Sequence, residues 1–245
     1  MRRAKPCPSV GDRVTDWVWQ SNDAIADDIA WLESLGASAN AGWEPRSGAF
    51  EDDIWVLHPM YENITPNVKR GATPGARVLW GELWRRNGVT LGEGMVHPPG
   101  IMWIVGPGAE FQRDGVFAHE NLYEPEEGTL DSETLAQLVP RLPEDSGPIH
   151  AVWDVLAAAR VPRGAVRSDV YEHIGVHATL DQILDVTAPP GGWLHTPSNF
   201  WPEDRSWLVF TDYDLWATRV YGTAELIASL EEAPDLETLR WSPPT

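Results

Sequence analysis

The sequence predicts an α+β fold, with a mixed, mainly antiparallel sheet and helices packed on one side of it. Helical and strand-like segments are mixed without the strict strand–helix–strand rhythm of a parallel α/β fold. The strand-like segments are short and closed by breakers, as in IWVLHP (54–59), where Pro59 would stop a central ladder. Neither of the two common glycine-rich phosphate-binding loops is present, which argues against a nucleotide-binding α/β fold.

Helices are predicted where apolar residues recur at helical spacing between capping residues. Ser21 or Asn22 begins the first helix and Gly36 ends it, and Thr223 begins the last one. The predicted helices are 21–36, 77–88, 131–142, 177–186 and 223–234.

Strands are predicted at short apolar runs between these helices. The run from Trp207 to Asp214 starts apolar on both faces, as in a central strand, and forms a hairpin with the strand at 216–222. The predicted strands are 54–59, 101–105, 149–156, 166–175, 207–214, 216–222 and 236–241.

The 245 residues fit one large domain or two small ones. Residues 1–20 are predicted to form a flexible amino-terminal arm. Two α+β halves follow, 21–125 and 126–245, and the alternative is one single domain over 21–245.

Composition excludes several classes of function. A net charge of −19 repels nucleic-acid phosphates and anionic lipid surfaces, so we expect no direct nucleic-acid or membrane partner and favour a protein with a basic surface. A single cysteine, Cys7, excludes a disulfide framework and a cysteine-based zinc site. The basic amino terminus lacks the apolar region of a signal peptide, which predicts a cytoplasmic protein. The fourteen tryptophans are spread over the chain, which favours core positions for most of them.

Four residues are candidates for catalysis. His58 and His97 each precede a proline near a predicted strand end, where a histidine can act as acid or base. Asp212 and Asp214 share one face of the predicted 207–214 strand, where two carboxylates suit acid–base work or a divalent cation. The alternatives are a histidine that hydrogen-bonds locally and aspartates that lie in solvent at the strand end.

The segment WPEDRSW (201–207) holds the candidate binding residues Trp201, Arg205 and Trp207. It is either a groove where these side chains meet a ligand or partner, or a turn that leads into the central hairpin. His173 and His177 have the spacing of two metal ligands on one helix face, but Gly175 between them disfavours a helix. We therefore predict no metal site and no cofactor.

The carboxyl-terminal run SNFWPEDRSWLVFTDYDL, with AVWDVL before it and YGTAELIASL after it, resembles a group of uncharacterised actinobacterial proteins with a WPxDRxW segment. IWVLHP and RVLWGELWRRNG resemble their amino-terminal half. The resemblance covers the chain from about residue 50 onward. It implies a soluble bacterial protein and transfers no activity and no catalytic residue.

Two functions are compatible with these patterns. The first is a non-enzymatic binding or interaction module of the immunity or regulatory type, favoured by the acidity, the tryptophans and the lack of a catalytic motif. The alternative is a hydrolase that uses histidine with aspartate or glutamate, with or without a divalent metal.

Overall fold

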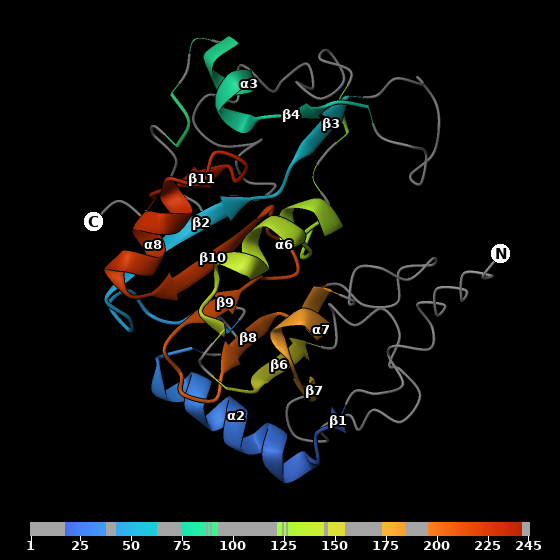
Figure 1. The fold of residues 1–245 in the computed structure, drawn as a ribbon, viewed down its shortest axis with the longest axis vertical. Coiled ribbons are helices and arrows are strands. Elements are labelled where there is room, and N and C mark those ends of the chain that lie inside the picture. Colours follow the sequence, from blue (N-terminus) through green and yellow to red (C-terminus); the bar gives the residue numbers. More distant parts are fainter. Residues whose placement is uncertain are drawn as a thin grey trace, which may run out of the picture.

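A computed structural model describes residues 18–37, 43–62, 75–86, 88, 90–92, 122–123, 125, 127–144, 147–154, 173–184 and 196–241. Its main feature is an eight-stranded sheet whose neighbouring strands all pair antiparallel (Figure 1). In order across the sheet, the strands are β1 (Val18–Trp19), β7 (His173–Ala178), β6 (Ile149–Asp154), β8 (Asn199–Pro202), β9 (Leu208–Phe210), β10 (Ala217–Gly222), β2 (Asp52–Leu57) and β11 (Thr238–Leu239). A smaller sheet holds β4 (Arg77–Val78), β3 (Met60–Glu62) and β5 (Leu122–Tyr123).

Helices cover both faces of the larger sheet. The helices α6 (Ser132–Leu138), α7 (Leu180–Leu184) and α8 (Ala224–Glu231) share one buried cluster with the sheet, together with the 3-10 helix η4 (Val139–Arg141). On the opposite face α2 (Asn22–Ser34) and α3 (Trp80–Arg86) pack into a second buried cluster. The predicted α+β class with a mainly antiparallel sheet is confirmed. One side carries α6, α7 and α8 as expected, and α2 adds a layer on the other side (Figure 1).

The predicted caps account for the helix starts. Ser21 accepts the backbone N–H of Ala24 at 3.3 Å, and Thr223 accepts that of Leu226 at 3.2 Å. Gly36 follows α2 with φ +83°, a conformation that glycine adopts without steric cost. The predictions for α2 and α8 are therefore confirmed by the side chains on which they relied.

Other predicted boundaries shift because tertiary pairing overrides local pattern. The helix predicted from 77 begins only at Trp80, because residues 77–78 pair in β4. The carboxylate of Glu237, 157 residues away in the chain, accepts the N–H groups of Trp80 and Gly81 at 2.7 Å each and so caps α3. The helix predicted from 177 begins at Leu180, since β7 continues to Ala178.

The predicted strand 207–214 is shorter in the structure. It ends at Phe210, and a turn follows in which Asp212 Oδ1 accepts the N–H of Asp214 at 3.2 Å. The predicted strand at 101–105 lies outside the described residues.

The larger sheet takes β1 and β2 from before residue 125 and its other strands from after it. Residues 18–19, within the predicted arm, form β1 at the edge of this sheet, and residues 1–17 lie outside the described part of the chain. Most described tryptophans are core residues, six of them less than 2% exposed, as their spread predicts. Of the described helices, none has the length and apolar character needed to cross a membrane.

Candidate metal-binding site

Three neighbouring strands place a row of rings on the sheet face that α2 covers. The antiparallel register pairs His177 of β7 with His150 of β6, and His150 with Trp201 of β8. Directly paired residues of adjacent strands project to the same face, so the three side chains lie next to one another. The ring centroids of His150 and His177 are 4.4 Å apart, and His150 stacks on Trp201 at 5.6 Å with 12° between the planes.

Helix α2 brings a carboxylate to this row. Ile25, Ile29 and Leu32 bury the helix against the sheet, and Asp28 lies on the same helical face because it follows Ile25 by three residues. Its side chain is only 5% exposed. Asp28 Oδ1 lies 2.9 Å from His150 Nδ1. One ligand atom from each of Asp28, His150 and His177 lies within 4.8 Å of the other two, which makes this group a candidate metal site.

A buried amide fixes the orientation of Asp28. Gln20 Nε2 donates a 2.6 Å hydrogen bond to Asp28 Oδ2, and Gln20 is only 4% exposed. Its backbone N–H donates to the carbonyl of Gly175 at 2.9 Å. A Cβ atom at Gly175 would lie 1.9 Å from Gln20 Oε1. Gly175 is therefore the residue that leaves room for the amide that holds Asp28.

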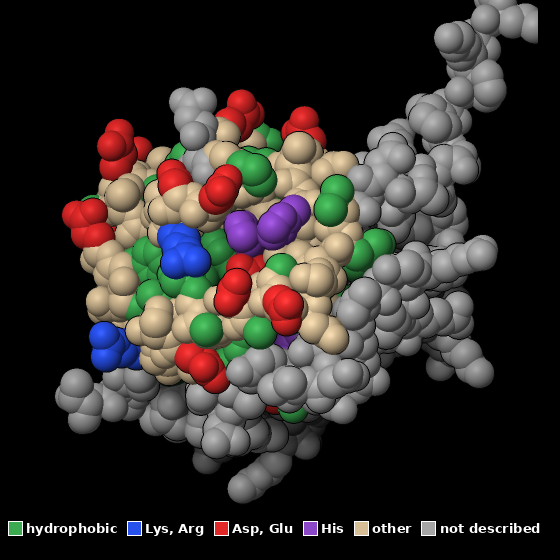
Figure 2. All heavy atoms as spheres, turned by 90° about the horizontal axis from the view of Figure 1, so that it is seen from below, with side chains coloured by type: hydrophobic (Ala, Val, Ile, Leu, Met, Phe, Trp, Pro, Cys, Tyr) green, Lys and Arg blue, Asp and Glu red, His purple; other side chains and the backbone are tan. Residues whose placement is uncertain are grey.

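The cluster is buried at one end and open at the other. His177 is exposed, the side chain of His150 is 18% exposed, and Asp28 lies beneath them. Figure 2 shows histidine side chains next to each other at the surface, with acidic side chains beside them. Partial desolvation, and then the neighbouring His150, lower the pKa of His177 below its usual 6.5, against the opposing charges of Asp28 and Glu203. A neutral imidazole, the form that ligates metals, is therefore the main form of His177 at pH 7.

The described residues among those predicted for catalysis lie elsewhere. His58 is 1% exposed and bonds through Nε2 to Thr218 Oγ1 at 3.0 Å, which is the local structural role left open as the alternative. Asp212 and Asp214 lie in the turn after β9 and not on a strand face. His97 lies outside the described residues. None of the three described candidates belongs to the Asp28–His150–His177 cluster.

The structure brings together two of the three predicted binding residues. Trp201 lies on the sheet face that α2 covers, and the centroid of its ring is 4.7 Å from that of Trp31. The guanidinium carbon of Arg205 lies over Trp31, 5.1 Å from the ring centroid. Trp207 packs against Phe200 on the opposite face of the sheet. Trp201 and Trp207 are both 0% exposed, so neither indole forms part of the surface.

The sequence analysis considered His177 only together with His173 and rejected that pair as metal ligands. His173 and His177 are four residues apart on a strand, which separates them by about 13 Å. His173 is buried and meets Trp43 edge-on at 5.2 Å. The alternation in IHAVWD and HIGVHA was the available signal, because it places His150 and His177 on the faces opposite to Ala151 and Val176. The register that makes them partners is not visible in the sequence.

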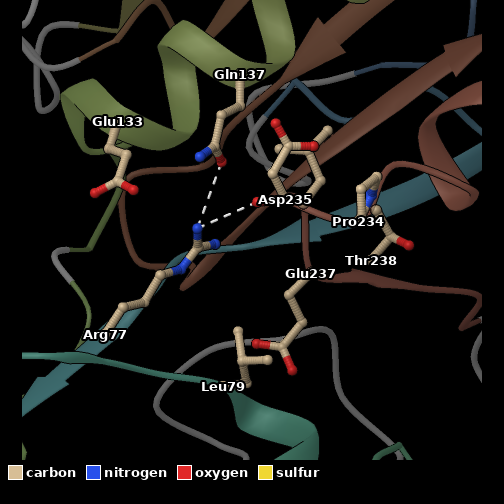
Figure 3. Close-up of a pocket in the computed structure, with 9 residues that line it drawn as sticks. Arg77, Leu79, Glu133, Gln137, Pro234, Asp235, Glu237 and Thr238 are labelled. Atoms are coloured by element: carbon tan, nitrogen blue, oxygen red, sulfur yellow. Dashed lines mark hydrogen bonds between the residues drawn. The ribbon is translucent and has the colours of Figure 1, made fainter.

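A separate cavity of about 440 Å³ lies between β4, α6 and residues 234–238 (Figure 3). Arg77 donates to the side chain of Gln137 at 3.4 Å and to the carbonyl of Asp235 at 3.2 Å. The carboxylates of Glu133, Asp235 and Glu237 also line the cavity and outnumber its one arginine, so its charge does not suit an anion. It contains no predicted site residue.

Comparison with known proteins adds no relative: no family model matches the chain, and neither a curated protein nor a solved structure matches it.

Proposed function

We propose that the protein binds a divalent transition-metal ion through Asp28, His150 and His177 and acts as a metal-dependent hydrolase. The observation that carries the proposal is the convergence of three ligand-type side chains from α2, β6 and β7, with one side open to solvent. The proposed activity is the hydrolase alternative from the sequence analysis, but its residues are Asp28, His150 and His177 and not those predicted there.

The donor set and spacing fit such an ion. Two imidazole nitrogens and one carboxylate oxygen are typical ligands of zinc and its neighbours. Around a tetrahedral ion, ligand atoms are about 3.3 Å apart. The present spacing brackets that value, from 2.9 Å between His150 Nδ1 and Asp28 Oδ1 to no more than 4.8 Å within the group.

Three protein ligands with an open position are typical of catalytic zinc sites, whereas structural sites are closed by four. When bound, the ion lowers the pKa of a coordinated water and polarises a substrate oxygen. Asp28, whose Oδ2 is held by Gln20 Nε2, would offer Oδ1 as the third ligand beside the two imidazoles. The proposed site therefore depends on Asp28.

Hydrolysis is the reaction class that needs no further protein nucleophile. The sequence has no serine-nucleophile elbow and a single cysteine in the amino-terminal segment. Water then supplies the nucleophile: its oxygen bonds to the carbonyl or phosphoryl centre, the bond to the leaving group breaks, and the leaving group departs with a proton. The same donor set also binds Fe²⁺ in oxygenases, so the choice of metal is part of the test.

The test is metal binding to chelator-treated protein, followed by isothermal titration with Zn²⁺, Co²⁺ and Fe²⁺. We expect one equivalent of Zn²⁺ or Co²⁺ to bind, and Asp28→Asn, His150→Gln and His177→Gln each to weaken binding by at least about 10-fold. Asp27→Asn is the matched control, because it removes the same charge from an exposed neighbour on α2.

A panel of carboxylic and phosphoric esters, assayed with and without EDTA, then tests the hydrolase part of the proposal. EDTA-sensitive hydrolysis that Asp28→Asn abolishes would support it. Absence of stoichiometric metal in the wild-type protein would contradict the proposal, and oxygen-dependent turnover with Fe²⁺ would replace hydrolysis as the reaction.

A binding module for a protein with a basic surface is a second candidate, supported by the net charge of −19. Because Trp201 and Trp207 are buried, neither can contact a partner protein directly. Trp31 and Arg205, which contact each other nearby, remain as candidate contact residues. Co-purification at low salt, reconstitution with the isolated partner and loss of the complex at high salt would test it. A reconstituted complex that persists unchanged in high salt would contradict its electrostatic basis.

A further inference from the structure

We propose that Arg205 forms an oxyanion-binding subsite next to the metal cluster, so that the ligand of this site carries a carboxylate or phosphate group. This inference rests on the proposed metal site and names the chemical class of the molecule that the site takes.

The position of Arg205 is the first observation. Its guanidinium lies 5.1 Å from the centroid of the Trp31 ring. Trp31 contacts Trp201 at 4.7 Å, and Trp201 stacks on His150 at 5.6 Å. A continuous row of rings therefore joins the arginine to the histidines. Figure 2 shows a basic side chain on the same face as the histidine pair.

The donors of Arg205 are the second observation. A guanidinium that lies over an indole face does not use its N–H groups as hydrogen-bond donors in that contact, so they stay available to a ligand. Within the described part of the chain, no residue accepts a hydrogen bond from this guanidinium or forms an ion pair with it. Four other described arginines form ion pairs, namely Arg86, Arg141, Arg219 and Arg240. Arg205 thus offers the planar donor edge that binds carboxylate or phosphate through two parallel hydrogen bonds.

The backbone of Arg205 is the third observation. Its φ is +60°, in the left-handed region that favours glycine or asparagine. The turn around it is held on both sides, because the N–H of Arg205 donates to the carbonyl of Pro202 at 2.9 Å and the N–H of Ser206 donates to Asp204 Oδ1 at 3.0 Å. Arg205 thus has a backbone conformation that glycine would adopt at lower energy. Residues with such unfavourable backbone angles cluster at active sites and ligand sites.

Charge makes anion binding depend on the metal. Without an ion, and among the described residues near this row, the carboxylates of Asp28, Glu203 and Asp204 carry three negative charges against the one positive charge of Arg205. A divalent cation cancels this excess of negative charge, which would otherwise repel an anion. We therefore expect the oxyanion to bind to the metal-loaded protein and not to the metal-free protein.

The experiment uses full-length protein loaded with one equivalent of Co²⁺ and freed of excess metal. Inorganic phosphate and acetate are titrated separately, with calorimetry and the visible cobalt absorption as readouts. Arg205→Gly removes the guanidinium and tolerates the positive φ, Arg205→Lys keeps the charge without the planar donor edge, and Arg85→Ala is the control. Arg85 is an exposed arginine on α3, at the other end of the molecule from α2 (Figure 1).

We expect at least one anion to bind and to change the cobalt spectrum. Arg205→Gly should lower the affinity for that anion by about 10- to 100-fold, which is the loss expected for hydrogen bonds between charged groups. Arg205→Lys should retain part of the affinity, and Arg85→Ala should retain all of it. Metal affinity should be the same in the wild type and the three variants. The anion that binds more tightly, phosphate or acetate, shows whether the ligand carries a phosphate or a carboxylate group.

Two results overturn the inference and leave the metal proposal standing. One is metal-loaded protein that binds neither anion, and the other is Arg205→Gly that binds the anion as tightly as wild type. Wild-type protein that takes up no metal overturns the metal proposal and this inference with it.

Discussion

Gly175→Ala is the substitution whose effect can be worked out most directly from the structure. The added Cβ would lie 1.9 Å from Gln20 Oε1, and real Cβ atoms essentially never approach a neighbour closer than 3.0 Å. The amide must therefore move by at least about 1.1 Å. Gln20 is 4% exposed and has little free space, so this movement breaks its 2.6 Å hydrogen bond to Asp28.

The expected cost has two parts. Overpacking a buried position costs about 1–3 kcal/mol, and losing a hydrogen bond to a charged group costs about 1.5–3 kcal/mol. Gly175→Ala should therefore lower the free energy of unfolding by about 2.5–6 kcal/mol, measured by urea denaturation. Metal affinity should fall by about 10- to 100-fold, because the carboxylate loses the partner that orients it.

The control is the same substitution in a Gln20→Ala background. Without the amide, the closest remaining contact of the new Cβ is Ile25 Cγ1 at 3.1 Å, which can shift slightly. Gly175→Ala should then cost less than about 1 kcal/mol, so the double-mutant cycle should give a coupling of about 1.5 kcal/mol or more. Equal costs in both backgrounds would refute the packing argument.

Three further substitutions test the frame around the site. Glu237→Ala removes the carboxylate that caps α3 and should cost about 2–4 kcal/mol in urea denaturation, because two backbone N–H groups lose a charged acceptor. Arg219→Met leaves two partly buried carboxylates without their cation and should cost about 2–3 kcal/mol, whereas a charge-keeping lysine should cost less. Asp52→Asn should cost up to about 1 kcal/mol near pH 7, as expected for a surface pair with Arg240. Hydrogen bonding to Arg240 lowers the pKa of Asp52 below 3.8, so the unfolded chain binds the proton more readily, and the advantage over the asparagine variant should disappear as the pH falls below about 3.8. A difference between the two proteins that does not change with pH would contradict this assignment.

Local signals in the sequence were sufficient for much of the fold. Ser21, Gly36 and Thr223 act through their own backbone neighbours, so the bounds of α2 and α8 follow from nearby residues. The cap of α3 could not be predicted in this way, because Glu237 is far away in the chain.

The candidate site depends on long-range register, which a single sequence does not contain. His150 and His177 meet because β6 and β7 pair in one of several possible alignments, and a shift by one residue would turn one ring to the other face. The hairpin of β8 and β9 places Phe200 opposite Val209, which leaves Trp201 and Trp207 on different faces despite their closeness in sequence. Asp28 could be recognised as polar on an apolar helix face, but its partner belongs to the sheet.

The amino-terminal edge of the sheet also determines how easily the cluster comes apart. β1 is only two residues long, and among the described strands it pairs only with β7; Gln20 follows it directly. Short edge strands fray at a free energy far below that of global unfolding. We expect fraying of β1 to withdraw the Gln20 side chain from Asp28 while β6, β7 and β8 stay paired. Hydrogen exchange at the backbone N–H of Gln20, which donates to the Gly175 carbonyl, should report how often β1 detaches. A bound cation should slow that exchange.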